Sequence, residues 1–193
     1  DGLVEIWNGM PFLSPLWCRG PRVAWLHHVH GAMWQMVLPP NLAGVGEFVE
    51  SRLAPPLYRR TRVITLSESS KREMVDQLGF RPHRVDVVPP GIDPRFRPGG
   101  ERSADPLVVA VGRLVPVKPF DVLIRTMQRV REQVPTAWLS IVGEGFERPD
   151  LDALVRDLDA DSWVDFAGRV DDEGLVDLYR RAWMAVSTST REG

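Results

Sequence analysis

Residues 107–118 read LVVAVGRLVPVK, and this stretch decides the fold. Leu107–Val111 is a short apolar run typical of a strand buried on both faces. Gly112 ends the run, and Pro119 stands where a helix over 120–133 would begin, a position that proline tolerates. A buried strand, a glycine turn and an amphipathic helix predict one repeat of a parallel, helix-covered sheet.

The same alternation continues on both sides of this stretch. Downstream, the pattern predicts strands over 137–142, 163–166 and 184–187 and helices over 149–158 and 173–182. Upstream, it predicts strands over 3–7, 23–26, 62–66 and 84–88 and helices over 42–58 and 67–78. The first of these helices is expected to be interrupted at Pro55-Pro56. In the second, Ser70 and Glu73 have the spacing of a capping box. The fold class is therefore α/β, with two Rossmann-like domains that contain parallel sheets.

A segment rich in Pro, Gly, Arg and Asp separates the two pieces. We predict a linker over 94–106, one domain over 1–93 and a second domain over 107–193. The chain begins at Asp1 without a methionine and ends just after a predicted strand, so we expect both domains to be incomplete.

Composition sets broad limits on function. The 193 residues carry a formal net charge of -2, which gives no general attraction for nucleic acid or anionic membranes. The single cysteine, Cys18, excludes an internal disulfide and suits a reducing compartment. No apolar run approaches the roughly 18 residues of a membrane span. We therefore expect a cytoplasmic protein, with the inner membrane surface as a second location.

Candidate phosphate ligands follow the strand over 107–111. Arg113 offers a planar fork of donors and Lys118 a compact charge, both close to a predicted helix start. Two cations there would hold a diphosphate, helped by the helix dipole. The alternative is that both are ordinary solvated loop charges.

Two further loops follow predicted strands. Gly143-Glu144-Gly145 resembles the start of a dinucleotide fingerprint, but Arg148 stands where the third glycine belongs, so the fingerprint fails. A tight turn explains the two glycines equally well. Near the end, Glu192 could accept hydrogen bonds from sugar hydroxyls, or it could be an exposed turn acid.

Three histidines, His27, His28 and His30, follow the strand over 23–26. A metal site needs further ligands, and no Cys, Asp or Glu is close in sequence, so we expect no metal. A histidine at a strand end could move a proton or donate a hydrogen bond. The alternative is three satisfied polar residues packed near Trp25 and Trp34.

Taken together, the ordered motifs resemble the retaining GT-B glycosyltransferases of the fourth sequence family, the group 1 glycosyl transferases. The resemblance covers nearly the whole chain. The matching stretches are 87–93 (VVPPGID), 108–114 (VVAVGRL) with Lys118, 120–124 (FDVLI), 141–145 (IVGEG), 166–170 (FAGRV), and 178–193, in which Leu178, Tyr179, Ser187, Ser189, Glu192 and Gly193 match.

The resemblance implies donor-binding roles in the domain over 107–193. The implied donor-binding residues are Gly112, Arg113, Lys118, Gly143, Gly145, Arg169, Val170, Glu192 and Gly193. Arg113 and Lys118 would bind the diphosphate, and Arg169 with Val170 would lie against the nucleobase. Glu192 matches the first acid of the family's Glu-x7-Glu motif. The second acid would fall at position 200, beyond this sequence, so the fragment is expected to be inactive alone.

One departure from the family affects the phosphate loop. The family usually has glycine after the lysine, and Pro119 stands there instead. Proline has no backbone N–H, so one expected phosphate contact is missing.

In the domain over 1–93, the resemblance implies an acceptor side. The family often has a histidine after a strand that faces the reacting sugar. His27 fits this pattern best, and His30 is the alternative. The implied catalytic residues are His27, His30, Arg113, Lys118 and Glu192.

The implied activity is the transfer of a sugar from a nucleoside-diphosphate sugar to an acceptor hydroxyl with retention of configuration. We expect no cofactor and no metal, a carbohydrate or lipid-linked acceptor, no nucleic acid, and peripheral membrane contact at most. Two alternatives stay open: a GT-B-like sugar-nucleotide epimerase, and a non-catalytic nucleotide-binding module.

Overall fold

The computed structural model describes residues 1–31 and 33–189. These residues form two compact units, Asp1–Gly91 (unit 1) and the residues from Ile92 onward (unit 2). Each unit contains its own four-stranded sheet, and every strand pair in both sheets is parallel. The predicted α/β class with parallel sheets is therefore confirmed. None of the described helices is long and apolar enough to cross a membrane.

Unit 2 has the doubly wound topology that sequence alternation predicts. Its strands are β5 (Leu107–Val111), β6 (Trp138–Val142), β7 (Val164–Gly168) and β8 (Met184–Ala185). They lie in the order β7-β6-β5-β8, so the chain moves outward from β5 and then returns to its other side. The switch point of this sheet, where ligands of such folds bind, thus lies between β5 and β8.

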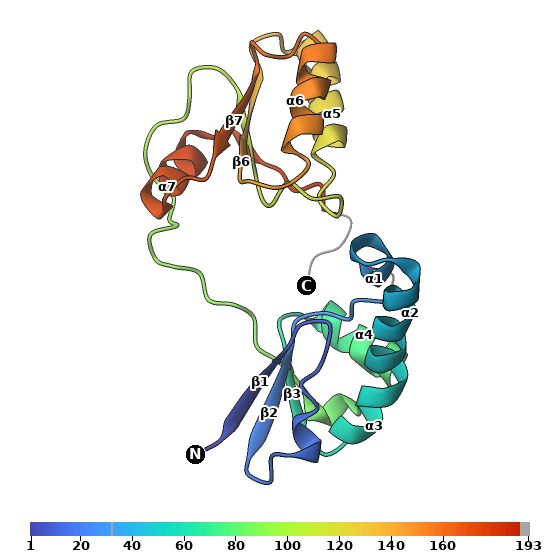
Figure 1. Ribbon diagram of the computed structural model, residues 1–193. Coiled ribbons are helices and arrows are strands. Elements are labelled where there is room, and N and C mark those ends of the chain that lie inside the picture. Colours follow the sequence, from blue (N-terminus) through green and yellow to red (C-terminus); the bar gives the residue numbers. More distant parts are fainter. Residues whose placement is uncertain (32, 190–193) are drawn as a thin grey trace. The chain divides into compact units, whose positions relative to one another are not determined.

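Helices cover both faces of the unit 2 sheet. The helices α5 (Phe120–Gln133) and α6 (Arg148–Asp157) lie on one face, and α7 (Asp172–Arg181) lies on the other (Figure 1). On α5 the buried residues are Phe120, Leu123, Ile124 and Met127, the spacing of one helix face. This face packs into a core with Leu139 and Ile141 of β6.

Unit 1 has consecutive strand order. Its strands are β1 (Leu3–Trp7), β2 (Arg22–Leu26), β3 (Arg62–Thr65) and β4 (Val85–Val87), in the order β1-β2-β3-β4. Its helices are α1 (Met33–Val37), α2 (Pro40–Phe48), α3 (Ala54–Tyr58) and α4 (Glu68–Leu78), with a π-helical segment η2 (Val49–Leu53) between α2 and α3. Short 3-10 turns, η1 (Ser14–Leu16) and η3 (Pro82–Arg84), complete the unit.

Two helix predictions in unit 1 need correction. The predicted helix over 42–58 is α2, η2 and α3 in succession, and Pro55 and Pro56 do not interrupt it, because they lie in the first turn of α3, where proline is tolerated. The predicted capping pair Ser70 and Glu73 does not begin α4. Ser67 does, since its side chain accepts a hydrogen bond of 3.1 Å from the Ser70 N–H.

Residues 93–103, which we call the strap, lie along α7 within unit 2. At one end Arg95 Nη2 lies 2.9 Å from Asp172 Oδ2, and the rings of Phe96 and Tyr179 meet edge to face at 6.1 Å between centroids. At the other end the Ser103 N–H donates to the Arg181 carbonyl at 2.9 Å. The sequence predicted as a linker is thus attached to a helix at both ends, although residues 93–102 are exposed.

Candidate functional site

Three loops leave the carboxyl ends of β5, β6 and β7, and backbone hydrogen bonds connect them. The Gly112 N–H donates to the Val142 carbonyl at 2.9 Å, and the Leu114 N–H donates to the Glu144 carbonyl at 3.0 Å. The Gly143 N–H donates in turn to the Gly168 carbonyl at 2.8 Å. The predicted donor-binding residues Gly112, Gly143 and Gly145 therefore belong to one connected surface at the sheet edge.

The Gly-x-Gly pair is explained by the closeness of two of these loops. A Cβ at Gly143 would lie 2.0 Å from the Gly112 carbonyl oxygen, and the φ of Gly143 is +137°. A Cβ at Gly145 would lie 2.1 Å from the Leu114 carbonyl oxygen. Any other residue would push the β6 loop off the β5 loop. The glycines thus have a packing role, and their contact with a donor stays a prediction.

Lys118 spans the switch point of the sheet. Its Nζ donates a hydrogen bond of 3.0 Å to Ser189 Oγ, which lies after β8, although the two residues are 71 positions apart. Gly112 makes room for the lysine stem, because a Cβ there would lie 2.8 Å from Lys118 Cδ. The ammonium group is therefore held where ligands of open α/β sheets usually bind.

Arg113 is exposed in the same loop and has no hydrogen bond or ion pair to any described residue. All five N–H donors of such an exposed, unbonded guanidinium group can bind a ligand or water. The pairing of Arg113 with Lys118 on one diphosphate stays a prediction.

The remaining predicted donor residues have different surroundings. Arg169 is exposed just after β7, whereas Val170 packs into the apolar cluster that includes Leu175 and Leu178 of α7. Val170 therefore contributes to the core beneath α7. Glu192 and Gly193 lie outside the described residues.

Acidic groups lie close to the loops as well. Burial raises the pKa of Glu147, which stands just before α6, and the charges of Asp121 and Asp150 raise this pKa further. The Glu147 N–H donates to the Leu114 carbonyl at 3.3 Å, so this acid borders the β5 loop. A bound diphosphate would feel some repulsion here, which makes the cations of the loop more important.

In unit 1, the predicted histidines follow the carboxyl end of β2. The His27 carbonyl accepts a hydrogen bond of 3.2 Å from Thr65 Oγ1 at the end of β3, and the His27 ring meets Trp25 edge to face. His28 and His30 stack with 4.7 Å between ring centroids. The side-chain partners of His27 and His30 therefore differ, which bears on their predicted roles.

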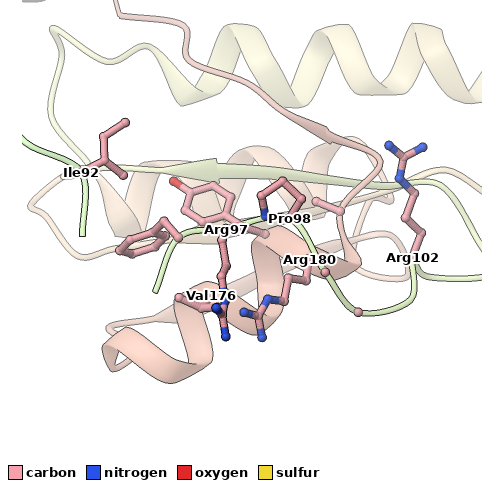
Figure 2. A pocket seen from close by; sticks show the side chains of 11 residues that line it. Ile92, Arg97, Pro98, Arg102, Val176 and Arg180 are labelled. Carbon is pink, nitrogen blue, oxygen red and sulfur yellow. The ribbon is translucent and has the colours of Figure 1, made fainter. Parts of the chain in front are cut away.

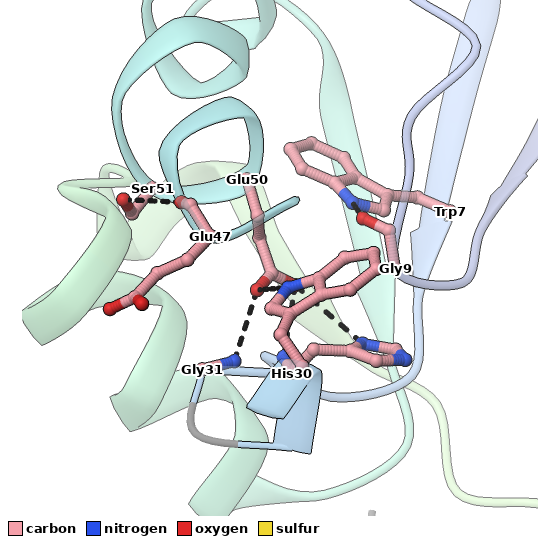
Figure 3. A network of polar contacts seen from close by, with 8 residues as sticks. Trp7, Gly9, His30, Gly31, Glu47, Glu50 and Ser51 are labelled. Atoms are coloured by element: carbon pink, nitrogen blue, oxygen red, sulfur yellow. Dashed lines mark hydrogen bonds and ion pairs between the residues drawn. The ribbon is translucent and has the colours of Figure 1, made fainter. Parts of the chain in front are cut away.

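A buried acid that the sequence interpretation did not single out holds the histidine loop. Glu50, in η2, is only 1% exposed. Its carboxylate accepts hydrogen bonds from the His30 N–H at 2.9 Å, the Gly31 N–H at 3.1 Å and Trp34 Nε1 at 3.0 Å (Figure 3). His30 Nδ1 lies 3.6 Å from Glu50 Oε1. The carboxylate thus fixes the backbone at His30 and lies within ion-pair distance of its ring.

The pKa of Glu50 reflects two opposing effects. Burial raises the pKa, but the hydrogen bonds from His30, Gly31 and Trp34 lower it by more, so the pKa lies below its ordinary value of 4.5. The carboxylate is therefore charged at neutral pH. The charged Glu50 carboxylate lies 3.6 Å from His30 Nδ1, whereas His27 has no carboxylate within ion-pair distance among the described residues.

A sequence signal for Glu50 existed. Ala43, Gly46, Glu50 and Ala54 are all buried, and their spacing is that of one core-facing helix stripe. An acid at a core position is rare unless it is paired, so this position indicates a partner. Within residues 1–31 and 33–189, no group of three or more His, Cys, Asp or Glu could hold a metal ion.

Two family models match the sequence. The model described as glycosyl transferases group 1 matches residues 92–193, and the model described as glycosyltransferase family 4 matches residues 3–96. The two matches divide the chain close to the boundary between the two units.

Curated relatives match the chain over about two thirds of its length. A D-inositol 3-phosphate glycosyltransferase of Nocardia farcinica is 32% identical over 148 residues, which is 68% of this chain and 33% of the relative. The protein of the same name from Kribbella flavida is 32% identical over 163 residues, which is 75% of this chain and 37% of the relative. The chain thus spans about a third of the length of these relatives.

Solved structures share the fold at low sequence identity. A glycosyltransferase of Rickettsia africae aligns with a TM-score of 0.72 and 15% identity, over 98% of this chain and 51% of that one. The HepE protein of Anabaena, solved in complex with UDP-glucose, aligns with a TM-score of 0.68 and 22% identity, over 90% of this chain and 48% of that one. These likenesses support the GT-B fold alone. Since the group 1 model covers more than half of the chain, the chain belongs to the glycosyl transferases group 1 family.

Proposed function

We propose that the protein containing this chain transfers a sugar from a nucleoside-diphosphate sugar to an acceptor hydroxyl, with retention of configuration and without a metal. Family membership and the HepE protein crystallised with UDP-glucose support the donor class. The name of the curated relatives suggests a phosphorylated polyol as one acceptor to test. We place the reaction in the cytoplasm, with the inner membrane surface as a second location.

One observation supports the proposal most directly. The Lys118 ammonium group lies at the switch point between β5 and β8 and donates a hydrogen bond to Ser189 Oγ. Donor cleavage leaves negative charge on the departing diphosphate. A preorganised ammonium stabilises that charge more in the transition state than in the ground state, and this difference accelerates the reaction. Arg113 would add a second cation from the same loop.

The acceptor side is proposed to use the histidine loop of unit 1. Either His27 or His30 would position the acceptor or take up its hydroxyl proton. The Glu50 carboxylate accepts a hydrogen bond from the His30 N–H and lies beside the His30 ring, which suits a positioning role for His30. We propose His27, which has no such carboxylate beside it among the residues that the structure describes, as the group that takes up the proton.

The decisive experiment replaces Lys118 with alanine in the protein from the complete reading frame. We expect turnover with a labelled UDP-, GDP- or ADP-sugar to fall by roughly 10²-fold, as for other lost transition-state charge contacts. The matched control is Lys71→Ala on α4, because Lys71 is the other lysine of the sequence. Turnover equal to wild type in Lys118→Ala would overturn the assignment of this residue.

The anomeric configuration of the product, read by NMR, tests retention. An inverted product would contradict it. Product analysis also separates the two alternatives, because an epimerase returns an isomerised nucleotide sugar and transfers nothing, and a binding module leaves the donor intact.

A further inference from the structure

A second concentration of positive charge lies in unit 2, between the strap and α7. A groove of about 540 Å³ is lined by the arginines Arg97, Arg102 and Arg180 and by no acidic residue. Its other walls are largely apolar and include Ile92, Phe96 and Tyr179. The whole chain has a net charge of -2, so this clustering is a local property of the groove.

The arginines of the groove have no anionic partner in the described part of the chain. No hydrogen bond or ion pair joins the side chain of Arg97, Arg102 or Arg180 to any described residue. The neighbouring cations behave differently, because Arg95 pairs with Asp93 and Asp172 and Arg181 pairs with Asp177. Unpaired guanidinium groups gathered in one groove indicate an external anion.

Arg180 is partly buried, whereas Arg97 and Arg102 are exposed. Its Nε is buried and has no hydrogen-bond partner, which costs free energy unless a ligand supplies one. Gly100, at φ +77°, packs over its stem, since a Cβ there would lie 3.4 Å from Arg180 Cβ. The strap therefore holds this side chain in place.

Arg97 and Arg180 share one end of the groove. Both also line an adjoining cavity of about 560 Å³, so they stand at the boundary between the two spaces. In Figure 2 their guanidinium groups extend in the same direction, whereas that of Arg102 extends in another. Glu173 lines the adjoining cavity too, but it lies outside ion-pair distance of both arginines.

We propose that Arg97 and Arg180 bind a phosphate or diphosphate group, carried by a ligand whose apolar part contacts Ile92, Phe96 and Tyr179. This site is separate in sequence from the Arg113 and Lys118 loop, and it does not depend on the proposed transfer reaction. Two guanidinium groups match the geometry of phosphate oxygens. The shared chemistry fits a free diphosphate and a lipid phosphate head group alike.

Hydrogen exchange with inorganic diphosphate tests the proposal, because it reports each segment separately. We expect diphosphate to slow exchange in peptides that cover the strap and the end of α7. In Arg97→Gln/Arg180→Gln, the concentration for half-maximal protection should rise by at least about tenfold, the effect of losing charge-assisted hydrogen bonds. Arg129→Gln, on the exposed face of α5, is the charge-matched control.

Two further arms define the ligand and its place. Arg113→Gln/Lys118→Ala should leave protection of the strap unchanged, which separates this site from the predicted donor site. Flotation with phosphatidic acid vesicles, against phosphatidylcholine vesicles, tests the lipid source in the same variants. The exchange of core peptides shows that each variant is folded. The proposal is overturned when neither diphosphate nor phosphatidic acid binds in a manner that depends on Arg97 and Arg180.

Discussion

The two units hold their strand-end loops by different means. In unit 1 a buried acid does so, since the carboxylate of Glu50 accepts hydrogen bonds from two loop N–H groups and one indole. In unit 2 backbone hydrogen bonds connect neighbouring loops, and glycines allow the close approach. The first arrangement is sensitive to charge and pH, whereas the second is sensitive to added side-chain volume.

Unit 1 contains a second buried carboxylate that accepts hydrogen bonds from a loop. Glu5, 4% exposed, accepts hydrogen bonds from the Phe12 N–H at 2.7 Å and from the Tyr58 hydroxyl at 2.5 Å. Burial raises the pKa of Tyr58, and Glu5 raises it further, so the hydroxyl remains a donor at all ordinary pH values. Both acids thus order the loops that follow β1 and β2.

The largest effect should come from volume added between the loops of unit 2. Gly143→Ala would place a Cβ 2.0 Å from the Gly112 carbonyl oxygen and in an unfavourable backbone conformation. We expect it to destabilise unit 2 by about 3 kcal/mol or more in urea unfolding. Gly44→Ala is the control, because a Cβ at this position on α2 meets open space. Its free energy of unfolding should rise by up to about 1 kcal/mol. Equal midpoints for Gly143→Ala and wild type would refute the packing role.

Removal of the buried acid should come next. Glu50→Ala leaves the His30 N–H, the Gly31 N–H and Trp34 Nε1 without their acceptor, and we expect a loss of about 3 kcal/mol. The measurement is urea unfolding followed by hydrogen exchange of residues 27–34. If exchange in this loop stays as slow as in wild type, Glu50 does not order it. The stability of Glu50→Gln should lie between that of Glu50→Ala and that of wild type.

A smaller effect should appear as a pH dependence confined to unit 1. The pKa of Glu50 is below 4.5 in the folded state. Glu50 therefore contributes fully to the free energy of unfolding at a pH above its pKa in the unfolded chain. This contribution is lost as the pH falls through its pKa in the folded protein. Between about pH 6 and about pH 3, wild type should therefore lose more stability than Glu50→Gln. Parallel pH profiles for the two proteins would contradict a lowered pKa.

The smallest effect should come from the exposed ion pairs of the strap. Arg95 contacts Asp93 and Asp172 at 2.9 Å, and it lowers the pKa of Asp93 to about 2, but all three groups are open to solvent. We expect Arg95→Gln to unfold at the wild-type urea midpoint, because water screens such pairs. A clear shift of the midpoint that disappears in high salt would show that this pair anchors the strap.

The sequence allowed the fold to be predicted because its signals are local. The apolar run over 107–111, the glycines that follow and the helical spacing on α5 lie within 27 residues of each other. The site was predicted only in part. Lys118 was identified, but its contact with Ser189 spans 71 positions. The helical spacing marks Glu50 as a core position, but the loop that it holds is 20 residues away in the sequence, so its partners could not be predicted.

That π segment has a consequence for comparing relatives. A π turn accommodates one more residue than the α-helix around it, so it usually marks a single-residue insertion. Without that residue, the helix after Val49 would change phase by about 100°, and Glu50 and Tyr58 could no longer both face the core. An alignment across residues 40–58 should therefore place its gap at η2, and a relative without the insertion must hold its histidine loop in another way.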